Sequence, residues 1–393
     1  MTQWRHKKRG STYDEVCRAV LQASDPSLLA EGAEVVVYRG ADGRTWCRAA
    51  AEFGDGRFER LGAPEGLRLK KYSQWLISVP AWGQDYLRTF AECAAPALLA
   101  AVRALGEPVK FLIHTDRPDL ALAALPGQDV EVRPVGSHPT YVALQRAHAE
   151  AVAVAAPGDR VVLLNADLVV SGNLLVRCAE HFASGKQAVV LLGIRTAAGP
   201  ARPPAGGAPR ALLEWAWAHR HQIIRDLEWP HGQSMLPTNL FFACGGSVVA
   251  RGFHLHPAAI IKHADVDFSS TIDGDLLDCF PRESVHVVTD PDDCAMLEVS
   301  PPERRFPVRE GSLSPGNVAA AMATRASATH RWLFEQHRIG VVGPLCDCGD
   351  EAVVRETLEI MARGAPAQVG GRRGRDPAGR RGRIPGSPAD IVP

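Results

Sequence analysis

The sequence predicts an α/β protein whose main body is a mostly parallel sheet flanked by helices. Apolar runs typical of buried strands recur along the chain, at residues 74–79, 109–114, 129–132, 160–164 and 188–192. Segments with helical periodicity or an alanine-rich composition lie between them, at residues 85–105 and 140–155. Strands that alternate with helices need crossover connections, which make neighbouring strands parallel and cover both faces of the sheet.

Changes in composition divide the chain into four expected parts. Residues 1–62 carry short strand-like runs separated by Gly-containing turns and predict a small β-rich module. The α/β body is expected at residues 67–302, and a helical extension with helices at 317–338 and 351–362 at residues 303–363. Gly, Pro and Arg dominate residues 364–393, which predicts a disordered tail.

The overall composition excludes several classes of protein. The 393 residues include 44 basic and 44 acidic side chains, so no net field favours nucleic acid as a partner. Nine cysteines without a C-x-x-C pattern argue against a disulfide framework or a structural zinc site and favour a reducing, cytoplasmic location. The longest apolar stretch, residues 91–105, is interrupted by Glu92, Pro96 and Arg103, which predicts no transmembrane segment.

Short strings of strand and turn residues span most of the N-terminal module: Val37-Tyr38-Arg39, Asp42-Gly43, Trp46-Cys47-Arg48, and Phe53 with Arg57-Phe58. In these strings the module resembles a small bacterial and phage domain of unknown function. Ala49 stands where that family usually has Pro. The resemblance implies an accessory binding or structural module without enzymatic activity.

The strongest local signal for chemistry is a polar cluster that follows a buried strand. Residues 160–164 are succeeded by Asn165-Ala166-Asp167. Ligands of open α/β sheets bind at the carboxyl ends of strands. In extended backbone, residues two apart point the same way, so Asn165 could bind a ribose hydroxyl while Asp167 binds a divalent cation that bridges a diphosphate.

At this position the chain resembles the GT-A class of glycosyltransferases, whose Rossmann-like fold binds nucleotide-diphospho-sugars and carries D-x-D at the end of such a strand. Asn165 replaces the first Asp of that motif, which leaves one carboxylate for the Mn²⁺ or Mg²⁺ ion that the class implies. Further strings resemble a group of bacterial glycosyltransferases over residues 67–302: Trp82-Gly83-Gln84-Asp85-Tyr86, the helix with Leu144 and His148, Gly193-Ile194-Arg195, residues 253–257 and residues 271–275. The resemblance implies transfer of a hexosyl group from a nucleotide-sugar donor to an unknown glycan, lipid or protein acceptor.

Histidines form a second candidate cluster. If residues 253–256 form a strand, His254 and His256 share a face and could complete the cation or diphosphate site. A structural role, in which one of the two histidines only makes hydrogen bonds within the fold, is an equally good interpretation. His219 and His221 lie in a predicted helix, residues 211–227, where they point apart, so we expect both at the surface.

Carboxylates and one arginine complete the candidate site. Asp273 and Asp275 form a turn that could supply the general base for an acceptor hydroxyl, or could cap a helix. Further aspartates surround them: Asp265, Asp267, Asp278, Asp290, Asp292 and Asp293. Glu298 is a further substrate-binding candidate. Arg195 could hold a phosphate, because a planar guanidinium pairs with phosphate oxygens in a bidentate way.

Other nucleotide-binding and hydrolase patterns are absent from the sequence. It contains no G-x-G-x-x-G after a strand, no G-x-x-x-x-G-K-[ST] and no G-x-S-x-G, which argues against a dinucleotide-dependent oxidoreductase, a phosphate-loop ATPase and a serine hydrolase. The remaining alternative to a transferase is a catalytically degenerate relative that binds a nucleotide or a glycan.

Overall fold

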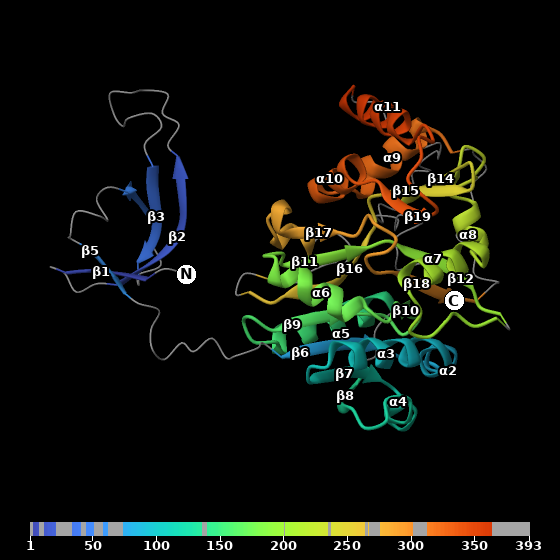
Figure 1. Cartoon of the computed structure of the whole chain (residues 1–393), viewed down its shortest axis with the longest axis horizontal. Helices are drawn as coiled ribbons and strands as arrows, with labels where there is room; N and C mark the ends of the chain where they lie inside the picture. Colours follow the sequence, from blue (N-terminus) through green and yellow to red (C-terminus); the bar gives the residue numbers. More distant parts are fainter. Residues whose placement is uncertain are drawn as a thin grey trace, which may run out of the picture. The chain divides into compact units, whose positions relative to one another are not determined.

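The structure is a computed structural model, which describes residues 3–7, 12–20, 34–40, 45–50, 58–61, 74–135, 140–199, 201–234, 237–263, 266, 276–301 and 313–363. The chain separates into two compact units, Met1–Tyr72 and Ser73–Pro393 (Figure 1). The predicted tail at residues 364–393 and the aspartates Asp265, Asp267, Asp273 and Asp275 lie outside the described residues.

The first unit is an antiparallel sheet, as its short apolar runs predict. Its strands are arranged in the order β4-β3-β2-β1-β5, with bounds Thr45–Ala49, Glu34–Gly40, Thr12–Val20, Gln3–His6 and Phe58–Leu61. Val36 and Tyr38 are buried against the sheet. The Tyr38 ring meets Tyr13 edge-on at 5.2 Å, and its hydroxyl accepts a hydrogen bond of 2.8 Å from Arg48 Nε.

The second unit contains a seven-stranded sheet that confirms the predicted fold class. Its order is β17-β11-β16-β9-β6-β7-β8, with bounds Val285–Val287, Ala188–Leu191, His256–Ile261, Arg160–Leu163, Trp75–Pro80, Val109–Thr115 and Asp129–Pro134. All neighbouring strands are parallel except β16, which is antiparallel to both β11 and β9. The sheet is therefore mostly parallel, and the antiparallel strand brings His256 to the carboxyl end of β9.

Helices cover both faces of this sheet (Figure 1). Trp75 of β6 packs its ring against Phe182 of α6 (Leu174–Ala183), whereas Ser78, three residues along the same strand, contacts His148 of α5 (Thr140–Val154). Since side chains of a strand alternate between faces, α5 and α6 lie on opposite faces. α3 (Ala95–Leu105) packs beside α6, and α4 (Pro118–Ala124) against β7.

Three predicted helices are interrupted. Residues 84–105 form α2 (Gln84–Thr89), a π-helical turn (Phe90–Ala94) and α3, an irregularity just ahead of Pro96, which lacks a backbone donor. The predicted helix at 211–227 divides into α7 (Pro209–Ala218) and α8 (Gln222–Arg225). The one at 317–338 divides into α9 (Pro315–Arg325) and α10 (Ala328–Gln336), because Ser327 caps α10 reciprocally with His330.

Two smaller sheets accompany the large one. The first has the order β10-β18-β12, with bounds Leu168–Val170, Met296–Ser300 and Gly193–Ala197. The second has the order β13-β14-β15-β19, with bounds Glu228–Trp229, Asn239–Cys244, Ser247–Gly252 and Ile339–Val342. β14 and β15 form a hairpin whose turn residues, Gly245 and Gly246, both have positive φ.

A buried ion-pair network fixes the last helix, α11 (Asp350–Ala362), to the rest of the unit. Asp350 is 1% exposed and accepts a hydrogen bond of 2.7 Å from Arg251 Nε of β15. Arg338 Nε lies 3.1 Å from both carboxylate oxygens. Burial opposes ionisation of Asp350, but the two guanidinium groups outweigh it and lower its pKa.

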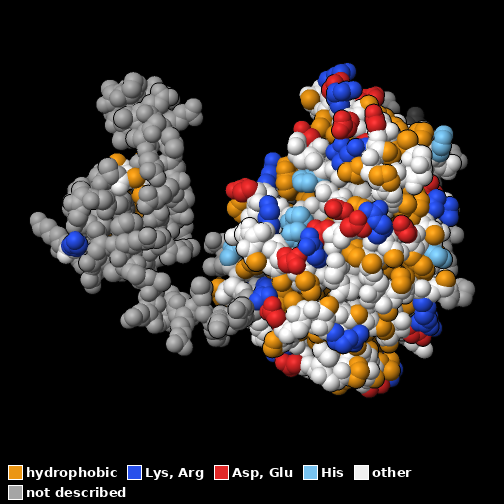
Figure 2. All heavy atoms as spheres, in the orientation of Figure 1, with side chains coloured by type: hydrophobic (Ala, Val, Ile, Leu, Met, Phe, Trp, Pro, Cys, Tyr) orange, Lys and Arg blue, Asp and Glu red, His pale blue; other side chains and the backbone are white. Residues whose placement is uncertain are grey.

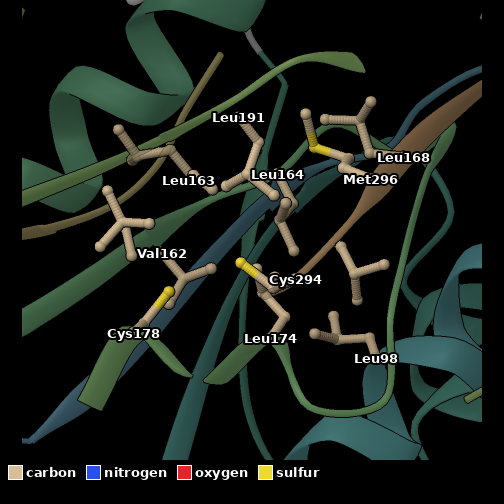
Figure 3. Close-up of a cluster of buried hydrophobic side chains, with 14 of the residues drawn as sticks. Leu98, Val162, Leu163, Leu164, Leu168, Leu174, Cys178, Leu191, Cys294 and Met296 are labelled. Carbon is tan, nitrogen blue, oxygen red and sulfur yellow. The ribbon is translucent and has the colours of Figure 1, made fainter. Parts of the chain in front are cut away.

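The core lies between the large sheet and its helices. Figure 3 shows part of it, where Val162 of β9 lies beside Cys178 and Leu174 of α6 lies beside Cys294. Burial raises the pKa of both thiols, so they stay protonated and inert. On the face shown in Figure 2, acidic and basic side chains are interspersed. Within the described residues, no helix combines the length and apolarity that crossing a membrane requires.

Candidate functional site

The carboxyl ends of three adjacent parallel strands, β7, β6 and β9, carry polar residues. Beyond β9, the Leu164 amide still donates to Ser78 O of β6 at 3.0 Å. Asn165 and Asp167 follow immediately. Beyond β7, both carboxylate oxygens of Asp116 accept from the Gly83 amide that follows β6, at 3.2 and 3.3 Å. This edge is where ligands of open α/β sheets bind.

The backbone turns at Asn165 instead of continuing in the extended form. The Leu168 amide donates to Asn165 O at 3.1 Å, so the chain leaves β9 of the large sheet and enters β10 of the small one within four residues. The same-face argument for Asn165 and Asp167 therefore does not apply. Asn165 is partly exposed, whereas Asp167 is 6% exposed and its carbonyl accepts from the Val299 amide at 2.9 Å.

A buried hydrogen-bond relay orients Asn165. Ser78 Oγ lies 3.0 Å from His148 Nδ1, and His148 Nε2 lies 3.1 Å from Asn165 Oδ1. His148 and Ser78 are both 0% exposed. Because Asn165 Oδ1 can only accept, His148 carries its proton on Nε2, and Nδ1 then accepts from the Ser78 hydroxyl. The hydrogen bond from His148 thus restricts rotation of the Asn165 amide.

Arg195 and Glu298 form an ion pair on the small sheet. They are register partners on the parallel strands β12 and β18, and Arg195 Nη2 lies 2.7 Å from Glu298 Oε2. Ser300 Oγ donates to the other carboxylate oxygen at 2.8 Å. Both side chains are less than one-fifth exposed. Glu298 also pairs in register with Leu168, the residue after Asp167. This pairing places the ion pair beside the segment that leaves β9.

His256 lies at the end of β9, whereas His254 has different surroundings. His256 Nε2 is 2.6 Å from Leu163 O. β15 ends at Gly252 and β16 begins at His256, so residues 253–255 connect two strands and His254 does not share a strand face with His256. The exposed His254 ring lies 6.4 Å from that of His330 of α10.

The structure corrects the expectation that His221 is a surface residue. His221 is 1% exposed, its Nδ1 accepts from the Ile223 amide at 3.1 Å, and its Nε2 lies 3.1 Å from Pro301 O. It is the N-cap of α8, and its amide donates to Arg195 O. The predicted helix breaks here because this backbone bond joins the chain to β12.

The sequence alone did not reveal Ser78, His148 or Asp116 as parts of this site. A histidine in an alanine-rich helix was visible, but its partners lie 70 and 17 residues away in sequence. Asp116 could have been found as the first carboxylate after a buried strand, by the reasoning that singled out Asp167. The predicted general-base residues Asp273 and Asp275 lie outside the described residues, so their roles stay predictions.

Comparisons with known proteins give structural neighbours at low similarity. No protein-family model matches the chain, and no curated protein matches it. The N-terminal resemblance therefore stays a prediction. A structure of TarS residues 1–349 from S. aureus is 11% identical, with a TM-score of 0.31, over 72% of this chain and 70% of that one. A second TarS structure is 10% identical, with a TM-score of 0.31, over 72% of this chain and 43% of that one.

A third solved structure covers a smaller part of the chain. It is a protein described as a glucose-1-phosphate thymidylyltransferase from Bacillus anthracis, in complex with sucrose. It is 13% identical, with a TM-score of 0.23, over 32% of this chain and 55% of that one.

Proposed function

We propose that the chain transfers a glycosyl group, of the hexosyl type, from a nucleotide-diphospho-sugar to an acceptor. The observation that carries the proposal is the polar edge at the carboxyl ends of β6, β7 and β9. An oriented amide, Asn165, and a carboxylate, Asp167, stand there at the point where the chain leaves the large sheet. A nucleotide needs such directional polar groups against an apolar sheet.

The site offers separate groups for the parts of the donor. The Asn165 amide, fixed by His148, is suited to a ribose hydroxyl because its donor direction is set before the ligand arrives. Arg195 is suited to a phosphate, which would compete with Glu298 for the guanidinium. Glu298, released from that pair, is suited to accept a hydrogen bond from a sugar hydroxyl.

The donor set fits a divalent cation that is held partly by the substrate. Asn165 Oδ1 accepts from His148, and Asp167 is the carboxylate that we assign to the ion. His256 donates through Nε2 to Leu163 O, an arrangement that metal-binding histidines commonly show on their second nitrogen. Mg²⁺ is usually held by one or two carboxylates together with substrate phosphates. When bound, the ion would neutralise charge on the diphosphate leaving group.

The acceptor proton needs a base, and we assign that role to Asp273 or Asp275. A carboxylate within hydrogen-bond reach of an acceptor hydroxyl removes its proton as the new glycosidic bond forms. His254 stays a weaker candidate for the cation, because its ring lies beside α10 and not beside β9.

Donor binding tests the proposal directly. Thermal-shift titrations with UDP-, GDP- and CMP-sugars, with and without Mn²⁺, should show stabilisation by one of these nucleotide classes. Asp167→Asn should weaken donor binding by at least roughly 10–100-fold, the effect of disturbing a cation's surroundings. If donor binding and turnover survive this change intact, Asp167 is not in the site.

A matched control is Asp119→Asn. Asp119 pairs with Arg117 on the surface, where both side chains are more than half exposed, so its loss should leave donor binding unchanged. Binding of a sugar nucleotide without any transfer or hydrolysis would favour the alternative function, a nucleotide- or glycan-binding protein without catalysis.

A further inference from the structure

Two histidines and an aspartate from distant parts of the sequence converge beside α6, away from the candidate donor site. His181 belongs to α6, His286 to β17, and Asp293 to the loop between β17 and β18. His181 Nε2 lies 2.9 Å and His286 Nε2 3.0 Å from the same oxygen, Asp293 Oδ2. The potential ligand atoms of the three residues all lie within 4.8 Å of one another.

We propose that His181, His286 and Asp293 bind a first-row divalent cation, with Zn²⁺ as the best match. Zn²⁺ bonds to imidazole nitrogen and carboxylate oxygen are about 2.0–2.2 Å long, so two ligand atoms of a tetrahedral site are roughly 3.3 Å apart. The two distances to Asp293 Oδ2 are close to that edge. Two imidazoles and one carboxylate are a ligand set that zinc shares with other transition metals.

The ring geometry also fits a shared ion. The imidazoles of His181 and His286 are stacked, with centroids 3.5 Å apart and planes inclined by 22°. This arrangement directs both Nε2 atoms to one point at Asp293. Without an ion, the N–H groups of both histidines would have to share Asp293 Oδ2 as their acceptor. A cation bound between the three side chains would instead be held by the Nε2 lone pairs of both rings.

The surroundings orient the carboxylate as outer-shell groups of metal sites do. Arg177 Nε donates to the other oxygen, Asp293 Oδ1, at 2.6 Å, which leaves Oδ2 toward the histidines. Asn173 Nδ2 donates to the Asp293 carbonyl at 2.7 Å. Burial alone would raise the pKa of Asp293, but its hydrogen bonds with His286 and Arg177 outweigh it and hold the carboxylate deprotonated.

Access and local chemistry are consistent with binding from solution. Asp293 is 8% exposed on its side chain, His181 14% and His286 25%, so an ion can enter past the histidines and keep a water ligand. Cys178 and Cys294 lie near in the chain, but both are buried in the apolar cluster shown in Figure 3. Neither belongs to the group of ligand atoms that lie within 4.8 Å of one another.

This cation site differs from the donor site. Asp167 joins the small sheet opposite Val299, whereas the Ser171 amide bonds to Ala295 O at the other end of the same strand pair. The three residues of β10 lie between Asp167 and Ser171, which are therefore four residue steps, roughly 13 Å, apart. An ion at Asp293 would tie the β17–β18 loop to α6 and so fasten the start of β18, the strand that carries Glu298 further along.

Zinc binding by the full chain tests the proposal. The protein is stripped with a chelator, dialysed, and titrated with Zn²⁺ in the absence of nucleotide, with bound metal measured by calorimetry and elemental analysis. Cys346 and Cys348 are replaced by Ser throughout, because their sulfurs lie 3.6 Å apart and could take up zinc on their own. One equivalent of zinc and an upward shift in Tm are expected.

The decisive variant is His286→Gln. A glutamine amide can still donate to Asp293 Oδ2. If the three side chains only hydrogen-bond to one another, the variant should therefore match the parent protein in stability and in zinc uptake. The cation site predicts loss of the bound equivalent and of the Tm shift. Uptake by His286→Gln equal to that of the parent, or no uptake by the parent, overturns the proposal.

Two controls complete the experiment. His219→Gln changes an exposed histidine that stacks on Trp215 and should retain the equivalent. Asp167→Asn should also retain it, because the donor site lies at the other end of the strand pair. Loss in Asp167→Asn together with retention in His286→Gln would place the ion at the donor site and refute this assignment.

Discussion

The relay Ser78–His148–Asn165 allows a prediction whose size follows from burial. We consider His148→Leu, which removes both ring nitrogens at nearly constant volume. Ser78 is 0% exposed, so its hydroxyl would be left without a partner, at a cost of about 1–3 kcal/mol. Asn165 is partly exposed, so its amide can hydrogen-bond with water instead, and the cost of its lost hydrogen bond is near the lower limit of that range. The expected loss in free energy of unfolding is about 2–4 kcal/mol.

A double-mutant cycle separates this mechanism from simple loss of packing. Ser78→Ala alone leaves His148 Nδ1 without its donor, but Ser78→Ala added to His148→Leu removes a hydroxyl that is already stranded. The second change should therefore cost at least about 1 kcal/mol less in the His148→Leu background than in the parent. Urea denaturation of the four proteins measures the cycle.

The same variants report on function. If Asn165 orients the donor, His148→Leu should raise KM for the nucleotide-sugar, because the amide is no longer fixed before binding. Costs that add to within about 0.5 kcal/mol, together with an unchanged KM, would refute both the relay and its role.

Two further predictions concern stability. The pKa of Asp350 is lowered in the folded chain, so its ion pairs stabilise the protein at pH values above the ordinary aspartate pKa. This contribution disappears as pH falls below about 4. In Asp350→Asn, the free energy of unfolding measured between pH 3 and 6 should therefore depend less on pH. Gly343 has φ +67°, and an added Cβ would lie 2.7 Å from Ser247 Oγ, so Gly343→Ala should lower the free energy of unfolding by about 1–2 kcal/mol. Gly316→Ala on α9 should not lower it, because there an added Cβ would make an ordinary contact with Ser314 Oγ at 3.9 Å.

The sequence revealed five of the seven strands of the large sheet, of which β6, β7, β9 and β11 are buried along almost their whole length, whereas β16 and β17 were not predicted. Runs such as residues 160–164 are apolar without alternation, which is characteristic of central parallel strands. β10, β12 and β18 were not predicted as a sheet, because strands of three to five residues gain their pairing from distant parts of the chain. The β14–β15 hairpin was missed although Gly245-Gly246 is a recognised turn signal.

The candidate site was predictable only as far as residues act locally. A polar residue after a buried strand identified Asn165 and Asp167, whereas the pairing of Arg195 with Glu298 depends on register across 103 residues. His181 and Asp293 are 112 residues apart and meet only because β17 pairs with β11 beside α6. No spacing rule in a single sequence can reveal such a cluster.

The passage from β9 to β10 limits how this protein can change. The Leu164 amide still bonds to β6, while the Asp167 carbonyl already bonds to β18. The two residues between these anchors belong to a turn that the Leu168 amide closes on Asn165 O, so we expect inserting or deleting a single residue to disturb this turn and the pairing of one sheet or the other. Sequence drift and loop engineering must therefore leave the length of this junction untouched, whatever ligand the protein binds there.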